Sequence, residues 1–127
     1  MIPKTITFIQ KNPTKVLSLD FENHRSWGQV FLKSNCGDNK QKWNFENEAL
    51  ISQYRSLSLD IKYGSAEPEV GASPHTNSLH QKWSLSLYRF YILITSKQTG
   101  KVLDTSLMSP GRVHMMSYHG CDNQLWF

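Results

Sequence analysis

The sequence predicts an all-β protein made of three tandem units of about 40 residues that close into one barrel. A tripeptide of the form Gln-x-Trp occurs three times, and apolar and polar residues alternate with a period of two around the copies. Glycines separate the strand-like segments, as turns require. The 127 residues are enough to bury one hydrophobic core, so residues 1–127 are expected to form a single domain.

The three Gln-x-Trp copies are in register with two further landmarks. The tryptophans are 40 and 43 residues apart, and a valine lies 13 residues before each of them. A Leu-Asp pair precedes each copy, with its Asp 21, 21 and 20 residues before the Gln. We therefore predict repeats at approximately residues 6–48, 49–91 and 92–127. Their Asp, Val and Trp landmarks are Asp20, Val30 and Trp43; Asp60, Val70 and Trp83; and Asp104, Val113 and Trp126.

Strands are expected where the alternation is clearest. In chain order these segments are 17–21, which begins Leu-Ser-Leu-Asp, 57–61, which does the same, and 83–87, which reads Trp-Ser-Leu-Ser-Leu. No stretch shows a sustained helical period flanked by caps. A propeller is excluded because it needs at least about four blades to close, whereas three such units suit a threefold barrel.

Composition and charge exclude several classes of function. The chain is 39% hydrophobic and 12% aromatic, with a formal net charge of +4, and its basic residues are scattered rather than clustered. A clustered basic stripe marks nucleic-acid binding, so no nucleic-acid partner is expected. The N-terminus lacks the apolar stretch of a signal peptide, and the longest apolar run, residues 91–94, is far too short to span a membrane. We expect a soluble protein without membrane insertion, which is cytoplasmic, released non-classically or a mature secreted form.

The three units, each with Leu-Asp early and Gln-x-Trp late, resemble the ricin-B-type (R-type, QxW) lectins over almost the whole chain. The resemblance implies a β-trefoil with pseudo-threefold symmetry. It also implies that each Trp packs in the barrel core and that each Gln forms hydrogen bonds within its own unit. In the family, a shallow pocket in each unit holds a sugar. An Asp accepts hydrogen bonds from two adjacent hydroxyls, an Asn donates one, and an aromatic or His side chain packs on the ring.

The resemblance implies galactose- or N-acetylgalactosamine-type glycans as ligands, and the third unit best fits the pattern. It keeps Asp104, and Asn123 lies directly before Gln124. The ring-stacking position falls on Met116, so another side chain must supply the stacking surface. The candidate sugar-binding residues of this unit are Asp104, His114, Met116, Tyr118, His119, Asn123 and Gln124.

The first and second units fit the pattern less well. In the first, Lys40 occupies the Asn position; in the second, Ser73 occupies the stacking position. The candidates of the first unit are Asp20, Phe31, Lys33, Asn35, Lys40 and Gln41, with Trp27 as a further aromatic that could stack. Those of the second are Asp60, Ser73, His75, His80 and Gln81.

Two cysteines are present, and we predict that both are free thiols. Cys36 and Cys121 fall at near-equivalent positions of different units, too far apart for a disulfide. Neither has metal-ligand spacing, so no metal or other cofactor is expected. The three unit aspartates lie in separate lobes and cannot form a catalytic carboxylate pair, so no enzymatic activity is expected.

The leading prediction is a multivalent lectin whose several sites would allow agglutination, with avidity that a homodimer would increase. The alternative is a non-lectin β-trefoil that acts through protein–protein contacts, like a protease inhibitor or growth factor, with vestigial sugar sites.

Overall fold

The computed structural model describes residues 5–11, 15–20, 28–61, 70–105 and 111–127, and these form antiparallel strands and short 3-10 helices. The 3-10 helices are η1 (Asn39–Gln41), η2 (Leu79–Gln81) and η3 (Asp122–Gln124). The strands are β1 (Val16–Asp20), β2 (Gly28–Lys33), β3 (Trp43–Glu46), β4 (Ala49–Ser52), β5 (Leu57–Ile61), β6 (Val70–Pro74), β7 (Trp83–Tyr88), β8 (Tyr91–Ser96), β9 (Val102–Thr105) and β10 (Val113–Met116).

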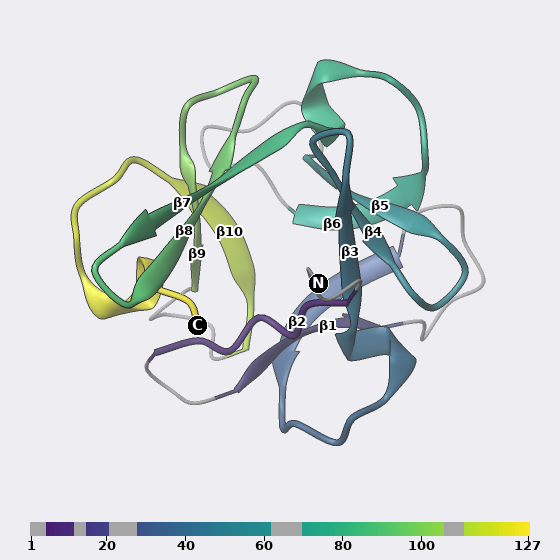
Figure 1. The fold of residues 1–127 in the computed structure, drawn as a ribbon, viewed down its shortest axis with the longest axis horizontal. Coiled ribbons are helices and arrows are strands. Elements are labelled where there is room, and N and C mark those ends of the chain that lie inside the picture. The colour runs from purple at the N-terminus through teal and green to yellow at the C-terminus, as the bar shows by residue number, and fades with distance from the viewer. Residues whose placement is uncertain (1–4, 12–14, 21–27, 62–69, 106–110) are drawn as a thin grey trace.

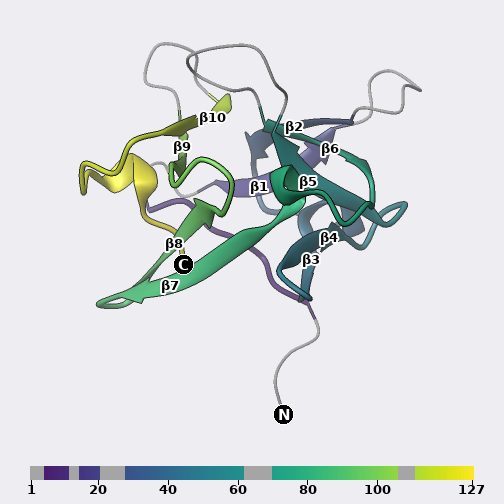
Figure 2. The same cartoon turned by 90° about the horizontal axis from the view of Figure 1, so that it is seen from above.

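The strands form two sheets, with the orders β1-β2-β6-β5-β4-β3 and β10-β9-β8-β7. Figure 1 shows three lobes around a common centre, and Figure 2 shows the β3–β4 and β7–β8 hairpins toward one side and β2, β6 and β10 toward the other. A further bridge, between Phe31 and Arg112, connects the two sheets. The all-β and β-trefoil predictions are confirmed, and the proposed repeat boundaries stay a prediction.

Backbone hydrogen bonds between segments distant in the chain close the barrel at each tryptophan. Trp43 exchanges hydrogen bonds with Ile6 at 2.7 and 2.9 Å, and Trp126 exchanges them with Ile92 at 2.7 and 3.1 Å. Trp83 donates its N–H to the carbonyl of Glu48 at 2.8 Å. The Trp43 and Trp126 pairs each lie within one unit, whereas the Trp83 bond joins the second unit to the end of the first. The first and third units are joined by the bonds of Lys11 N–H with the Leu125 carbonyl at 3.0 Å and of Phe127 N–H with the Ile9 carbonyl at 2.7 Å.

The core lies where the three units meet. Trp43, Trp83 and Trp126 are each 0% exposed, and the alternating Leu, Ile and Val residues of the strands pack against them. Burial of apolar surface contributes about 25 cal/mol per Å2, which makes these large side chains the main stabilising contacts of the barrel. The described residues include no helix that is long and apolar enough to cross a membrane.

Candidate functional site

A buried glutamine ends each 3-10 helix and holds the preceding loop closed. In every unit its Oε1 accepts from the backbone N–H five residues earlier, and its Nε2 donates to the carbonyl seven residues earlier. The contacts are Gln41 with Cys36 N (2.9 Å) and Ser34 O (2.8 Å), Gln81 with Thr76 N (2.7 Å) and Pro74 O (3.0 Å), and Gln124 with His119 N (2.9 Å) and Ser117 O (2.9 Å). The expectation that each Gln forms hydrogen bonds within its own unit is confirmed.

The three tryptophans of the motif are core residues. The indole N–H of each donates to a leucine carbonyl on the strand that carries the Leu-Asp pair of its unit, which is β1, β5 or β9. The pairs are Trp43 with Leu17 (3.2 Å), Trp83 with Leu59 (3.0 Å) and Trp126 with Leu103 (3.3 Å). The motif therefore builds the framework, and ligand chemistry depends on the residues around it.

These indole contacts show that the first Leu-Asp pair is not in register with the other two. Leu59 and Leu103 directly precede Asp60 and Asp104, whereas Leu17 directly precedes Ser18. Strand pairing shows the same shift. The residue after the landmark valine pairs with Asp60 in the second unit and Asp104 in the third, but with Ser18 in the first. Ser18, not Asp20, is the structural counterpart of the two aspartates, which corrects the sequence alignment.

Asp20 lies two residues beyond this position and has different partners. It pairs across the sheet with Gln29, and its carboxylate forms an ion pair with Lys33 at 3.2 Å. Gln81 and Gln124 donate to the aspartate of their own unit, while Gln41 donates to the Ser34 carbonyl.

The remaining candidates of the first unit are spread out. Phe31 is half-buried in β2, and the exposed Asn35 accepts from the N–H of Gly37 through its side-chain oxygen at 3.2 Å. The ammonium of Lys40 lies over the Tyr54 ring, 5.2 Å from its centroid. Trp27 lies outside the described residues.

In the third unit, Asp104 is a buried carboxylate surrounded by donors. It is 1% exposed, and Oδ1 accepts from Asn123 Nδ2 at 2.6 Å while Oδ2 accepts from Gln124 Nε2 at 2.8 Å. Asn123 also donates to the Thr105 carbonyl at 3.1 Å, which fixes its orientation. A buried carboxylate needs such hydrogen bonds to offset its lost hydration, and the two amides fix the orientation of Asp104.

Two imidazoles contact the same carboxylate at longer range. His114 Nε2 lies 3.5 Å from Oδ1 of Asp104, and His119 Nε2 lies 3.3 Å from Oδ2. Because His119 Nδ1 accepts from the N–H of Cys121 at 3.1 Å, a neutral His119 ring carries its proton on Nε2, the nitrogen that is 3.3 Å from Asp104. Four predicted residues thus converge on Asp104: His114, His119, Asn123 and Gln124.

The side chains at the rim of this cluster are more exposed. His119 is 39% exposed and Tyr118 is 49% exposed, while Met116 is half-buried. Gly120 has a φ of 79°, and a side chain there would meet the Tyr118 hydroxyl at 3.4 Å. The turn at Gly120 therefore lets the Tyr118 ring lie close to the backbone beside the cluster.

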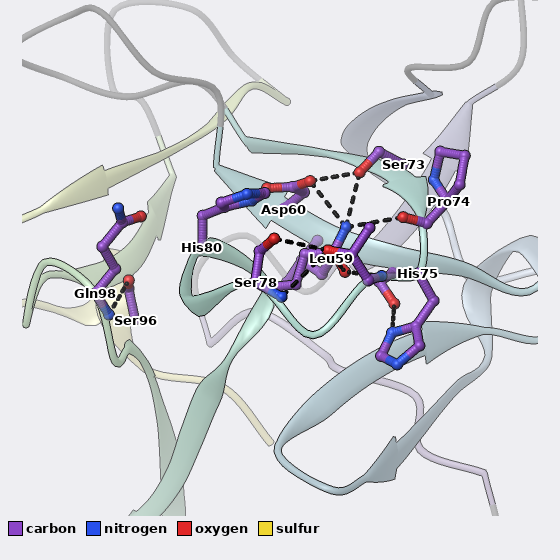
Figure 3. A network of polar contacts seen from close by, with 12 residues as sticks. Leu59, Asp60, Ser73, Pro74, His75, Ser78, His80, Ser96 and Gln98 are labelled. Atoms are coloured by element: carbon purple, nitrogen blue, oxygen red, sulfur yellow. Dashed lines mark hydrogen bonds and ion pairs between the residues drawn. The ribbon is translucent and has the colours of Figure 1, made fainter.

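In the second unit, Asp60 is also buried, at 4% exposed, and each of its oxygens has a close donor, as in Asp104, but the donors differ. Oδ1 contacts His80 Nδ1 at 2.5 Å, and Oδ2 accepts from Ser73 Oγ and from Gln81 Nε2, the latter at 3.0 Å. Figure 3 shows this closed network. His75 instead contacts the hydroxyl of Ser58 at 2.8 Å and is not part of it.

Two structural residues of the sites escaped the sequence analysis. The sequence did not single out Ser18, because Asp20 lies two residues later and at the expected distance of 21 residues from Gln41. Gln10 is fully buried and donates to the Asn123 carbonyl at 3.1 Å, which ties the first segment of the chain to η3. The available signal was its position directly after residues 6–9, of which three are large and apolar.

Cys36 and Cys121 are both exposed free thiols, as predicted. In the described part of the chain, no cluster of three or more His, Cys, Asp or Glu side chains is arranged to hold a metal ion.

The chain matches the family described as ricin-type beta-trefoil lectin domain over residues 5–126. No match was found among curated protein sequences. Among solved structures, the chain is similar to ThreeFoil, a designed threefold-symmetric protein, with 22% identity and a TM-score of 0.86 over 98% of this chain and 96% of that one.

Two lectin structures are also similar. The C-half of the earthworm R-type lectin, in complex with GalNAc, is 17% identical with a TM-score of 0.79, covering 98% of this chain and 97% of that one. The ricin B-like lectin of Macrolepiota procera, in complex with lactose, is 18% identical with a TM-score of 0.81, covering 99% and 96%. Two further matched structures, an exo-beta-1,3-galactanase from Clostridium thermocellum and a mosquitocidal holotoxin, are longer proteins, of which the chain spans 30% and 17%. At these identities the similarity establishes the fold.

Proposed function

The chain belongs to the ricin-type beta-trefoil lectin domain family, a family of carbohydrate-binding domains, and we propose that it binds galactose- or N-acetylgalactosamine-type glycans through its third unit. The observation that carries this proposal is the cluster around Asp104. There a buried carboxylate is oriented by two amides, and two imidazoles lie at its edge.

Asp104 suits a pair of adjacent sugar hydroxyls because a carboxylate offers two acceptor oxygens. The amide contacts, at 2.6 and 2.8 Å, are short, whereas the imidazole contacts, at 3.3 and 3.5 Å, are long. A sugar hydroxyl therefore displaces the imidazoles more readily than the amides. In the bound state, the turned imidazoles and Asn123 donate to the sugar oxygens, while Gln124, which is 0% exposed, only positions Asp104.

Tyr118 supplies the stacking surface in this proposal. Its ring is 49% exposed and lies beside Gly120, next to the cluster. An axial 4-hydroxyl leaves one face of galactose apolar, and an aromatic ring packs well on such a face. The galactose component of the lactose complex and the GalNAc complex of the two similar lectins support this sugar class.

We propose that the other two units contribute little to sugar binding. Both aspartates have a donor at each oxygen, but the imidazole contact of Asp60, with His80 at 2.5 Å, is much shorter than those of Asp104, at 3.3 and 3.5 Å, and Ser73 adds a hydroxyl donor to Asp60. A sugar would have to break these contacts to reach Asp60. In the first unit Ser18 replaces the acceptor, and Asp20 is paired with Lys33. Agglutination would then require a homodimer or larger assembly, because one site per chain cannot cross-link cells.

Replacing Asp104 tests the proposal. A single lectin site binds its sugar with about −4 to −5.5 kcal/mol, which calorimetry or NMR titration with methyl galactoside can measure. Asp104→Ala is expected to weaken binding at least about tenfold, because hydrogen bonds to a charged acceptor are worth about 1.5–3 kcal/mol. Asp104→Asn keeps the shape of the side chain but turns an NH2 group toward one of the two donor amides. It should lose most of the affinity, and circular dichroism checks that both variants are folded.

Asp20→Ala and Asp60→Ala are the matched controls, and both should bind within about threefold of wild type. If only Asp60→Ala loses binding, the assignment to the third unit is wrong. If no galactose- or GalNAc-bearing glycan binds on a glycan array, the lectin proposal fails. The protein-contact alternative would then predict a partner interaction that all three variants retain.

A further inference from the structure

The β7–β8 hairpin carries two large apolar side chains at its tip that nothing in the sugar site uses. Leu87 is 82% exposed and Phe90 is 89% exposed, the highest values among the large apolar residues of the described chain. Tyr91 follows Phe90 in the chain but lies on the opposite face of the hairpin from Leu87, because Leu87 pairs with Ile92 and Tyr91 pairs with the neighbouring position of β7. Its ring packs against that of Phe127, with ring centroids 5.0 Å apart. Leu87 and Phe90 are called the hairpin patch below.

The exposure results from the length of the hairpin. Trp83 and Leu85 lie on the face that packs on the core, and alternation places Leu87 on the same face. The equivalent β3–β4 hairpin has strands of four residues and turns at the polar pair Asn47-Glu48, whereas β7 and β8 have six residues each. The extra length places Leu87 beyond the core. Its side chain is therefore exposed to solvent, although it lies on the face of the strand that is buried nearer the base.

Backbone hydrogen bonds to the C-terminal segment anchor the hairpin, so its tip is held at a defined position. Ile92, which pairs with Leu87, exchanges two backbone hydrogen bonds with Trp126. Arg89 at the turn has a φ of 58°, a left-handed conformation that residues other than glycine rarely adopt. An exposed apolar pair on a turn of this kind is a marker of an interaction site.

Cations lie beside the apolar tip. The ammonium of Lys11 lies 4.5 Å from the centroid of the Tyr91 ring and 3.0 Å from Asp122 Oδ1. The hydrogen bond to Asp122 raises the pKa of Lys11 above its ordinary value, so this side chain stays charged at neutral pH. Arg89 adds a second exposed cation at the turn, and the whole chain has a net charge of +4.

We propose that the hairpin patch is a membrane-contact site that inserts Leu87 and Phe90 superficially among the headgroups of a bilayer containing anionic lipid. A convex tip with apolar ends and adjacent cations matches such a surface, because apolar side chains enter the interfacial zone while Lys and Arg remain with the phosphates. Anionic lipid attracts each nearby cation, and the basic net charge acts in the same direction. Contact of this kind requires no spanning segment and does not depend on sugar binding.

Vesicle sedimentation without any glycan tests this inference. The probe is phosphatidylcholine vesicles containing about 30 mol% phosphatidylserine, at an ionic strength of about 0.1 M. Wild type should sediment with these vesicles, and the double variant Leu87→Ser/Phe90→Ser should partition about tenfold more weakly. Leu79→Ser is the matched control, since Leu79 is 51% exposed but lies on η2, and it should bind like wild type.

The other outcomes overturn the proposal. It fails if wild type does not sediment, or if the double variant, with its unfolding temperature unchanged, binds vesicles as well as wild type does. It also fails if wild type self-associates in sedimentation velocity, the double variant does not, and neither binds vesicles, because the patch is then a contact between copies of the chain. Asp104→Ala should bind vesicles normally, which separates this proposal from the proposed sugar site.

Discussion

At the scale of single residues, the hydrogen-bond partners of each motif glutamine show whether it only supports the fold or also positions a site aspartate. Gln41, Gln81 and Gln124 make the same two contacts with their own loops, but only Gln81 and Gln124 also donate to a carboxylate. The same residue type therefore has a structural role in one unit and both a structural and a positioning role in the other two.

A matched pair of glutamine variants follows from this difference. Gln41→Ala and Gln124→Ala should each lower the free energy of unfolding by about 1–3 kcal/mol, because each removes two hydrogen bonds between a buried side chain and the backbone of its loop. Only Gln124→Ala should also weaken sugar binding, by about tenfold, since it removes one of the two amides that orient Asp104. Chemical denaturation and calorimetry measure the two effects, and equal losses of affinity would contradict the assignment.

At the scale of elements, turns decide what each hairpin presents. The β8–β9 turn uses Gly100 at a φ of 72°, with its N–H donated to the Ser96 carbonyl at 2.9 Å. Nothing lies within 4 Å of the position that a side chain would occupy. The requirement for glycine is therefore one of backbone conformation and not of space.

Gly100→Ala should lower the free energy of unfolding by about 1 kcal/mol, because a left-handed conformation costs other residues about 1–2 kcal/mol. Gly100→Asn is the control and should lose less, since Asn adopts this conformation more readily. Thermal or urea unfolding decides the point. Equal losses from the two variants would mean that side-chain size, and not φ, sets the cost.

At the scale of the whole molecule, the three units depend on one shared core. The three motif tryptophans, each 0% exposed, belong to one core cluster that contains residues of all three units. The barrel is expected to unfold as one cooperative unit for this reason.

Trp83→Ala tests this dependence. The variant should lose about 3–5 kcal/mol of stability, which is the usual cost of deleting a buried aromatic side chain. Leu79→Ala, at a side chain that is 51% exposed, should change stability by less than about 0.5 kcal/mol. A Trp83→Ala protein whose third unit unfolds separately, seen as two transitions, would contradict a single shared core.

The amino-acid sequence by itself determined the triplication, the β class, the family resemblance and the residues around Asp104. These features are readable because they are local: each Gln contacts groups five and seven residues away, and alternation directly reports which side of a strand is buried. The free thiols followed from the same alignment of units.

Only the tertiary structure decided the register of the first unit and the contacts that each aspartate makes. The strand β1 is placed by cross-strand pairing and by the indole of Trp43, and the spacing of Asp20 along the chain does not report either contact. The tertiary structure also showed that both carboxylate oxygens of Asp60 are in contact with neighbouring side chains, His80 and Ser73. It showed too that the length of β7 places Leu87 outside the core. The physical reason is the same in each case: these outcomes depend on contacts between strands, which sequence spacing constrains but does not specify.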